Sequence, residues 1–249
     1  MKHLDGRSRG WWSVLVLVAC GIVLTSQDSS AAPPPKRVTV DERVAEHGEQ
    51  ARARLAPLFA EARIPYPPQS VTLVGLKRER QVQLYATSPS GVTRFIRSYP
   101  VLGASGQLGP KLAEGDFQVP EGIYRIEALN SNSLFHLSLR VDYPNGFDRA
   151  RAKEEGRRRL GSDIMIHGGG ASTGCLSIGN PGIEELFVLA ADVGRANVSV
   201  ILTPFDLRSG KLTPELRAAR PWTPQLYGQI QRELAMLPLP KEQGVLAGR

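Results

Sequence analysis

A histidine and a cysteine joined by a glycine-rich turn are the residues of this chain best suited to chemistry. His167 and Cys175 lie in the stretch IMIHGGGASTGCLSIG, residues 164–179. Four of the seven residues between them are glycine. Glycine loses much backbone entropy on folding and buries no side chain, so such a turn is expected where the backbone bends sharply or closely approaches a ligand.

The pair suits nucleophilic catalysis. A thiolate is a strong nucleophile, and an adjacent imidazole can accept the proton of the thiol and later return it. The backbone N–H groups of Gly174 and Cys175 are then candidates to stabilise a developing oxyanion. No acidic residue occurs between positions 164 and 183. We therefore expect a backbone carbonyl, that of Gly168, to orient His167.

Two other interpretations compete with catalysis. Zinc sites use three or four protein ligands, whereas the chain has no HExxH or CxxC motif and only His136 is a credible third ligand beside the pair. The sequence thus predicts no metal and no cofactor. The other alternative is a buried structural cysteine and histidine, which does not account for the four glycines between them.

The N-terminal region predicts export. Basic residues precede an apolar run at 11–25, and the small-residue stretch SQDSSAAPPPK follows. This order is typical of a signal peptide, here cleaved after Ala31 or Ala32. Alternatively the run stays as a membrane anchor, or LVAC (17–20) is a lipobox with a lipidated Cys20. All three place the rest of the chain in the periplasm or cell envelope, where Cys175 has no partner for an internal disulfide if the leader is removed.

Charge and composition restrict the partners. The net charge is +7, with 22% charged and 41% hydrophobic residues. This basic excess suits nucleic acid, a membrane surface or an anionic wall polymer. Export and an aromatic content of only 6% argue against nucleic acid. A membrane contact is expected only through an uncleaved anchor or a lipidated Cys20.

The order of elements predicts a β-rich α+β fold. An amphipathic helix is expected at 41–62, ended by the prolines at 65, 67 and 68. A helix at 182–191 is expected to start with Asn180 as N-cap, and the tail at 212–237 is expected to be helical but broken by RPWTP. Strands are expected at 71–77, 81–87, 92–102, 122–129, 134–143, 163–168 and 197–205.

These elements give four parts: a leader or anchor (1–32), a linker and helix (33–64), a catalytic domain (65–206) and a helical extension (207–249). Within the catalytic domain, the connection at 103–121 is long and glycine-rich. Ordered loops of this kind often shape a site.

The turn HGGGASTGCLS resembles the HG…SxGC signature of YkuD-type L,D-transpeptidases, cysteine enzymes that remodel bacterial peptidoglycan. GPKLAEGDFQVPEGIY (109–124), FHLSLRVDYPN (135–145) and GSDIMIHGG (161–169) resemble the YafK-like branch in particular, and the resemblance spans roughly residues 68–206. It implies a YkuD-like β-sandwich catalytic domain flanked by N- and C-terminal helices.

The resemblance also assigns roles. Cys175 matches the nucleophile, His167 the base, and Gly168 the carbonyl that orients the base. Ser172, Gly174 and Cys175 match the SxGC turn that forms the oxyanion hole. Ser177 stands where many of these domains have an arginine, two residues after the cysteine. The way in which carboxylates of the substrate are held is therefore left open.

Candidate substrate contacts lie outside the turn. His136 and Arg140 alternate with Ser138 on one expected strand face, although His136 is equally well explained as a hydrogen-bonded structural residue. Lys111 and Glu114 belong to the long loop and are either substrate contacts or solvated. A basic cluster suits the carboxylates of stem peptides or the phosphates of wall polymers, or is a solvated connection; its members are Arg149, Arg151, Lys153, Arg157, Arg158 and Arg159.

The implied reaction is acyl transfer on peptidoglycan stem peptides. Cys175 attacks the carbonyl of the L-centre of diaminopimelate and forms a thioester. An amine acceptor gives transpeptidation, as a cross-link or a protein attachment. Water gives L,D-hydrolysis, including release of wall-linked protein. A non-catalytic wall-binding module is the alternative from another class.

Overall fold

The computed structural model describes residues 37–240. The expected leader or anchor, with Ala31, Ala32 and Cys20, lies outside this range. Within residues 37–240, no helix has the length and apolar character needed to cross a membrane.

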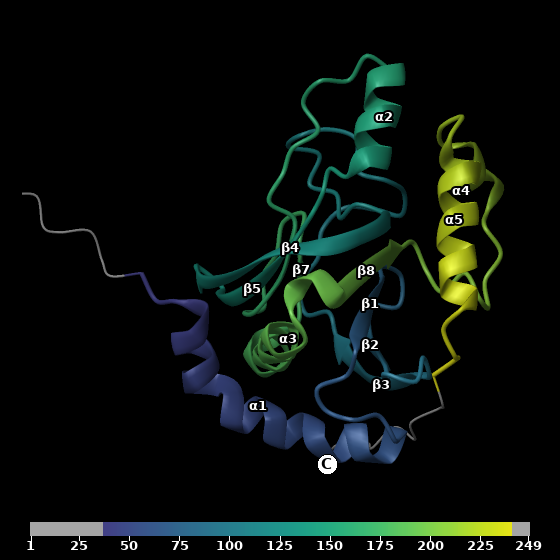
Figure 1. The fold of residues 1–249 in the computed structure, drawn as a ribbon. Helices are drawn as coiled ribbons and strands as arrows, with labels where there is room; N and C mark the ends of the chain where they lie inside the picture. Colours follow the sequence, from purple (N-terminus) through teal and green to yellow (C-terminus); the bar gives the residue numbers. More distant parts are fainter. Residues whose placement is uncertain (1–36, 241–249) are drawn as a thin grey trace, which may run out of the picture. The chain divides into compact units, whose positions relative to one another are not determined.

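Residues 37–240 contain five α-helices and eight strands, which form a mixed α+β fold, as the sequence predicts (Figure 1). The helices are α1 (Val40–Ala62), α2 (Gly146–Glu154), α3 (Gly179–Val193), α4 (Pro214–Ala218) and α5 (Thr223–Ala235). The strands are β1 (Ser70–Leu76), β2 (Gln81–Thr87), β3 (Thr93–Pro100), β4 (Gly122–Ser133), β5 (His136–Val141), β6 (Met165–His167), β7 (Leu176–Ser177) and β8 (Val198–Thr203).

The strands form one sheet in the order β3-β2-β1-β8-β4-β5-β6-β7. The pairs β1–β8 and β6–β7 are parallel, and the other neighbours are antiparallel. β4 belongs to two halves of the sheet, because Gly122–Arg125 pair with β8 and the part from Ile126 onward pairs with β5. The eight strands therefore form one continuous sheet, whose two halves are joined through one long shared strand.

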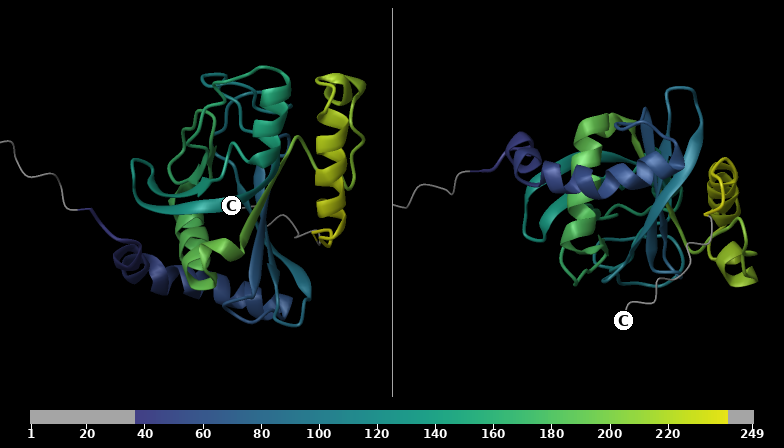
Figure 2. Two further views of the ribbon diagram at one scale, coloured as in Figure 1. Left: turned by 45° about the horizontal axis from the view of Figure 1, so that its top comes forward. Right: turned by 90° about the horizontal axis from the view of Figure 1, so that it is seen from below.

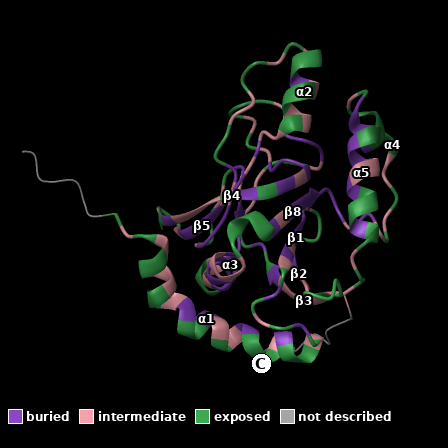
Figure 3. Cartoon of the chain, viewed as in Figure 1, coloured by how far each residue is buried: buried purple, intermediate pink, exposed green. Residues whose placement is uncertain are grey.

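Alternate side chains of a strand point to opposite faces of the sheet, and both faces of β1 are buried. On β1, Val71 and Leu73 enter the main core, whereas Val74 and Leu76 enter a second core. The main core contains α3 and packs it against both halves and α1; the second core packs α4 and α5 on the opposite face (Figures 1 and 2). Figure 3 shows α3 largely buried and the outer side of α1 exposed.

Polar contacts fix α1 to α3. Thr39 and Glu42 form a capping box at the start of α1, which satisfies N–H groups that the helix itself leaves free. Further along α1, Arg52 contacts Asp192 through two hydrogen bonds of 2.7 and 2.8 Å. A further contact between the two helices is made by Glu185, a buried carboxylate on α3, with Arg54 on α1.

Glu185 is expected to be essential for stability. Its carboxylate accepts hydrogen bonds from Arg54 (2.8 Å), Arg97 (2.9 Å) and the Tyr99 hydroxyl (2.9 Å). Glu185→Leu leaves these donors unsatisfied and is expected to lower the free energy of unfolding by about 3 kcal/mol. Urea unfolding measures this loss. The control Glu233→Leu, at an exposed position of α5, is expected to change it by less than about 0.5 kcal/mol; equal effects would contradict the assignment.

Three local predictions were wrong. Helix α2 lies in a stretch that charge alone suggested was a connection, and it is nucleated by a capping box of Asn145 and Asp148. Helix α3 begins at Gly179 rather than after Asn180, whose side chain accepts the Gly169 N–H instead of capping the helix (2.8 Å). Strand β5 begins only at His136, because a turn with a positive φ of 74° at that residue precedes the extended part.

Candidate active site

Strands β6 and β7 place His167 and Cys175 on one face of the sheet. Ile166 pairs with Leu176, and His167 with Ser177, in parallel register. Cys175 precedes β7 by one residue and lies beside Met165, whose N–H points to Sγ at 3.3 Å. Since directly opposed residues share a face and alternate residues do too, the side chains of His167 and Cys175 project to the same side.

Hydrogen bonds define the tautomer of His167. His167 is 2% exposed, and its Nδ1 lies 2.7 Å from the Gly168 carbonyl oxygen. A carbonyl only accepts, so Nδ1 carries the hydrogen and Nε2 keeps a lone pair. That lone pair accepts the Ser172 hydroxyl at 3.2 Å. His167 is thus oriented by the carbonyl that the sequence indicates, and Nε2 is available as a base.

Burial keeps His167 neutral. Desolvation lowers the pKa of His167, and the hydrogen bond to Gly168 opposes this only in part. The ring of Phe135 covers the imidazole with centroids 4.5 Å apart. The resting site therefore holds an uncharged imidazole at neutral pH.

Cys175 is the only cysteine among residues 37–240 and is partly buried. Its thiol donates to the Asp163 carbonyl at 3.5 Å. Burial is the main cause that raises the pKa of Cys175, and Asp163 adds to it, while the Met165 N–H and Lys111 lower it. Within the described part of the chain no hydrogen bond joins Sγ to His167. The resting pair is consequently a neutral thiol and a neutral imidazole, not an ion pair.

This electrostatic state predicts the pH dependence of thiol alkylation. Because the pKa of Cys175 is raised, the thiolate fraction and the iodoacetamide rate are expected to keep rising above pH 9, later than for a free cysteine peptide. Peptide-resolved mass spectrometry separates Cys175 from Cys20. A plateau already reached near pH 7 would instead indicate a preformed thiolate.

The long loop, Gly103 to Glu121, packs against the catalytic turn through a residue that the sequence did not single out. Gly174 has a φ of 79°, in the left-handed region that favours glycine. Its N–H donates to the Ser105 hydroxyl at 2.7 Å, and Ser105 donates to the Phe117 carbonyl at 2.7 Å. One expected oxyanion donor is therefore already hydrogen-bonded to a side chain of the long loop. In the sequence, the only indication of this contact was that Ser105 lies in the small-residue stretch GASG, residues 103–106.

Ser177 is hydrogen-bonded to the start of the turn. Its side chain is fully buried, and its hydroxyl contacts the Gly168 carbonyl at 3.3 Å and also that of Gly169. Its backbone exchanges hydrogen bonds with the loop, at Leu102 and Gly103. The residue at the position of the usual arginine thus holds the carbonyl that orients His167, and it offers no exposed group to a substrate.

Arginine is expected not to be tolerated at position 177. Ser177→Arg would bury a charge without a partner and is expected to reduce the free energy of unfolding by about 3–5 kcal/mol, measured in urea. Ser177→Ala serves as the control, since it loses one hydrogen bond worth about 1 kcal/mol. A stable Ser177→Arg protein would show that this position opens to solvent.

The thiol opens into a cavity of about 280 Å³ between the long loop and the segment before β6. Its lining residues are Lys111, Glu114, Gly115, Phe117, Gly161, Ser162, Asp163, Ile164, Thr173, Gly174 and Cys175. Lys111 is buried, and its ammonium is held by Asp116 at 2.5 Å and the Ala113 carbonyl at 2.9 Å. Glu114 is exposed and pairs with Arg159 at 2.8 Å. Both loop candidates therefore border the space in front of the thiol.

The two candidates on β5 differ in position. Arg140 pairs with Asp163 at 3.2 Å and so braces the residue whose carbonyl accepts the thiol. His136 does not line this cavity, because its positive φ breaks the strand alternation on which the expectation rested. Nε2 of its ring is hydrogen-bonded to Oε1 of Glu184 on α3 at 3.0 Å.

The basic cluster borders a second, larger cavity beside α2, of about 670 Å³. Arg151, Arg157 and Arg159 pair with carboxylates. Arg149, Lys153 and Arg158 line the cavity and make no ion pair within residues 37–240. Gly161 lines both cavities. The three unpaired cations are exposed, and the cavity that they line meets the cavity of the thiol at Gly161.

The fold and this site define an α+β protein with a neutral cysteine–histidine pair on one sheet face. No protein-family model matches the chain. The chain is 33% identical over 141 residues to "Putative L,D-transpeptidase YafK" of Escherichia coli K12 and equally to its counterpart in strain O157:H7. Each match covers 55% of this chain and 54% of the relative, so the chain matches about half the length of these relatives. The match confirms the predicted resemblance to the YafK-like branch of the YkuD-type L,D-transpeptidases.

Solved structures offer more distant likenesses. The helical cell shape determining protein Pgp2 of Campylobacter jejuni superimposes with a TM-score of 0.43 at 21% identity, covering 53% of this chain and 47% of Pgp2. Bd1075 of Bdellovibrio bacteriovorus gives 0.40 at 18% identity, covering 67% and 54%. Likenesses at this level carry no argument about function.

Proposed function

We propose that this chain is an exported cysteine acyl-transfer enzyme of peptidoglycan remodelling, an L,D-transpeptidase acting on stem peptides that contain diaminopimelate. One observation carries the proposal: Nε2 of His167 keeps a lone pair on the sheet face from which Cys175 opens into a cavity. The sequence match to YafK supports the substrate class. Export to the periplasm or cell envelope rests on the basic and apolar N-terminal sequence.

The first step forms the C–S bond, breaks the amide C–N bond and moves the thiol proton through His167 to the leaving amine. The thiol exchanges the Asp163 carbonyl for Nε2 of His167, which displaces the Ser172 hydroxyl and accepts the proton. Sulfur then attacks the carbonyl of the L-centre of diaminopimelate. The bond to the leaving D-amino acid breaks, the imidazolium returns the proton to the leaving amine, and a thioester remains on Cys175. The Gly168 carbonyl stabilises the imidazolium through Nδ1–H.

The acceptor decides between transfer and hydrolysis. An amine closes a new amide and regenerates the thiol, whereas water releases the shortened stem or a wall-linked protein. Incubation of purified protein with defined tetrapeptide muropeptides separates the two: new dimers indicate transfer, and monomers with shortened stems indicate hydrolysis. Neither product, with folded protein, would contradict the proposal and favour a non-catalytic wall-binding module.

The cationic cavity beside α2 is proposed to attract the anionic part of the substrate. Arg149, Lys153 and Arg158 make no ion pair among the described residues and line a cavity that meets the thiol cavity at Gly161. Ser177, at the position of the usual arginine, is buried and brings no charge. Carboxylates of stem peptides or phosphates of wall polymers have the complementary chemistry. No metal, cofactor or nucleic acid enters the proposed reaction.

A further inference from the structure

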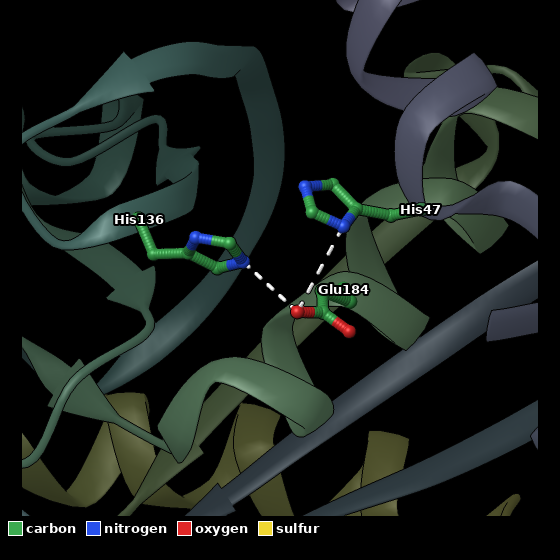
Figure 4. A group of neighbouring side chains, drawn as sticks. All are labelled: His47, His136 and Glu184. Carbon is green, nitrogen blue, oxygen red and sulfur yellow. Dashed lines mark hydrogen bonds and ion pairs between the residues drawn. The ribbon is translucent and has the colours of Figure 1, made fainter. Parts of the chain in front are cut away.

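Three side chains from separate parts of the chain converge on the side of α3 that faces α1. His47 comes from α1, His136 from the start of β5, and Glu184 from α3 (Figure 4). One ligand atom of each lies within 4.8 Å of the others. We propose that this cluster, here called the seam cluster, binds one divalent zinc-class metal ion that joins α1 to the catalytic domain.

The distances suit a small tetrahedral ion. His136 Nε2 lies 3.0 Å and His47 Nδ1 lies 3.9 Å from the same oxygen, Oε1 of Glu184. Bonds of about 2.0–2.1 Å at tetrahedral angles put ligand atoms about 3.3 Å apart. The two distances to Glu184 bracket that value, and the two imidazole nitrogens lie within 4.8 Å of each other, so the ligands must move closer to complete the arrangement. Two imidazoles and a carboxylate are a common zinc donor set, with water in the fourth position.

Neighbouring charges orient the ligands. The other oxygen of Glu184, Oε2, is held by Arg54 at 3.0 Å, which leaves Oε1 free to act as a single-oxygen ligand. On the far side of His47, Nε2 lies 3.6 Å from Glu46, and Arg43 holds that carboxylate at 2.7 Å. A carboxylate that accepts the N–H of a metal-bound histidine fixes its tautomer and strengthens it as a ligand; Glu46 lies on that side of His47 but beyond hydrogen-bond distance.

Nδ1 of His47, the proposed ligand atom, lies 3.9 Å from the Glu184 carboxylate, which is beyond hydrogen-bond distance. Nε2, on the opposite side of the ring, is buried with no hydrogen-bond partner among the described residues, and the ion would not contact it. The rings of His47 and His136 are edge-to-face with centroids 5.0 Å apart, so no hydrogen bond joins them. Zinc would replace the proton between His136 and Glu184. That proton moves to Nδ1 of His136, and the ring stays neutral.

The seam cluster lies behind the proposed base. Phe135, next to His136, stacks on the ring of His167. On α3, Asn180 lies one turn before Glu184 and accepts the Gly169 N–H of the catalytic turn. Binding of an ion would therefore order α1, the start of β5 and α3 together, at contacts that also hold His167. This role is positional and adds no step to the proposed acyl transfer.

Tag-free full-length Cys175→Ala protein is the sample for the test, because the catalytic thiol then cannot contribute a ligand. Titration with zinc chloride by calorimetry is expected to give one site, and cobalt(II) should give visible absorption bands of a low-coordinate ion. His47→Ala and His136→Asn are each expected to weaken binding by roughly a hundredfold or more. Asparagine is chosen because it tolerates the positive φ of residue 136.

Glu49→Gln, at an exposed position on α1, is the matched control and should bind as tightly as the parent. Protection of His47 and His136 from diethyl pyrocarbonate by zinc, read by peptide mass spectrometry, gives a second result without substitutions at the cluster. No binding by the parent, or equal binding by the parent and both histidine variants without protection, would overturn the proposal. Muropeptide turnover by wild-type protein is measured separately, so failure of either proposal is distinguishable.

Discussion

Cys175→Ser is expected to lower muropeptide turnover by roughly four orders of magnitude while the protein stays folded. A serine hydroxyl fits the same half-buried position, but its proton is far harder to remove, and the neutral His167 supplies only one weak base. Chromatography of products at high enzyme concentration measures the loss. Because the pKa of Cys175 is raised, the thiol is protonated at rest and must lose its proton to an acceptor as it attacks. Serine holds its proton more tightly still, so the substitution is expected to be severe.

Cys175→Ala is the control for residual activity. It is expected to be as inactive as the serine variant and to unfold at a similar urea concentration, since the thiol makes only long hydrogen bonds of 3.3 and 3.5 Å. Turnover by Cys175→Ala at even a tenth of the wild-type rate would show that another group forms the acyl intermediate or that none forms.

His167→Asn is expected to reduce turnover by about 10²- to 10⁴-fold, the usual worth of a general base. The asparagine amide can still donate to the Gly168 carbonyl, so the turn keeps its hydrogen bond while the base is lost. Thermal unfolding tests this point. A variant that keeps its stability and more than a tenth of its turnover would remove His167 from the proton transfer.

The pH profile follows from the same pair. The pKa of His167 is lowered by burial, so the acidic limb of kcat/KM is expected below about 6.5, the ordinary histidine value. Activity rises with pH through that limb because the imidazole must be neutral to accept a proton. It then stays level until the thiol ionises, above its ordinary value.

Local pattern made much of the site predictable. The glycine-rich spacing placed His167 and Cys175 on a strand, turn and strand, and the absence of a nearby acid pointed to the Gly168 carbonyl, which Nδ1 contacts at 2.7 Å. Hydrophobic alternation gave the α+β class and most strands. These features depend on neighbouring residues, so a single sequence carries them.

Contacts between distant segments were not predictable in this way. Ser105 meets Gly174 across 69 positions, and Glu184 meets His47 and His136 only because α3 packs beside α1 and β5. The positive φ at His136 reverses an alternation that the sequence presents as regular. Asp163, which accepts the thiol through its carbonyl, gives no side-chain signal at all.

Acylation by a carbapenem tests the central claim most directly. The wild-type protein is expected to gain the full mass of the drug, because the thiol of Cys175 adds to the β-lactam carbonyl, the ring C–N bond opens, and no atom leaves. Peptide mapping should place the adduct on Cys175, and Cys175→Ala should gain no mass. An unmodified wild-type protein, or an adduct that survives in Cys175→Ala, would contradict the assignment of Cys175 as the acyl-transfer nucleophile.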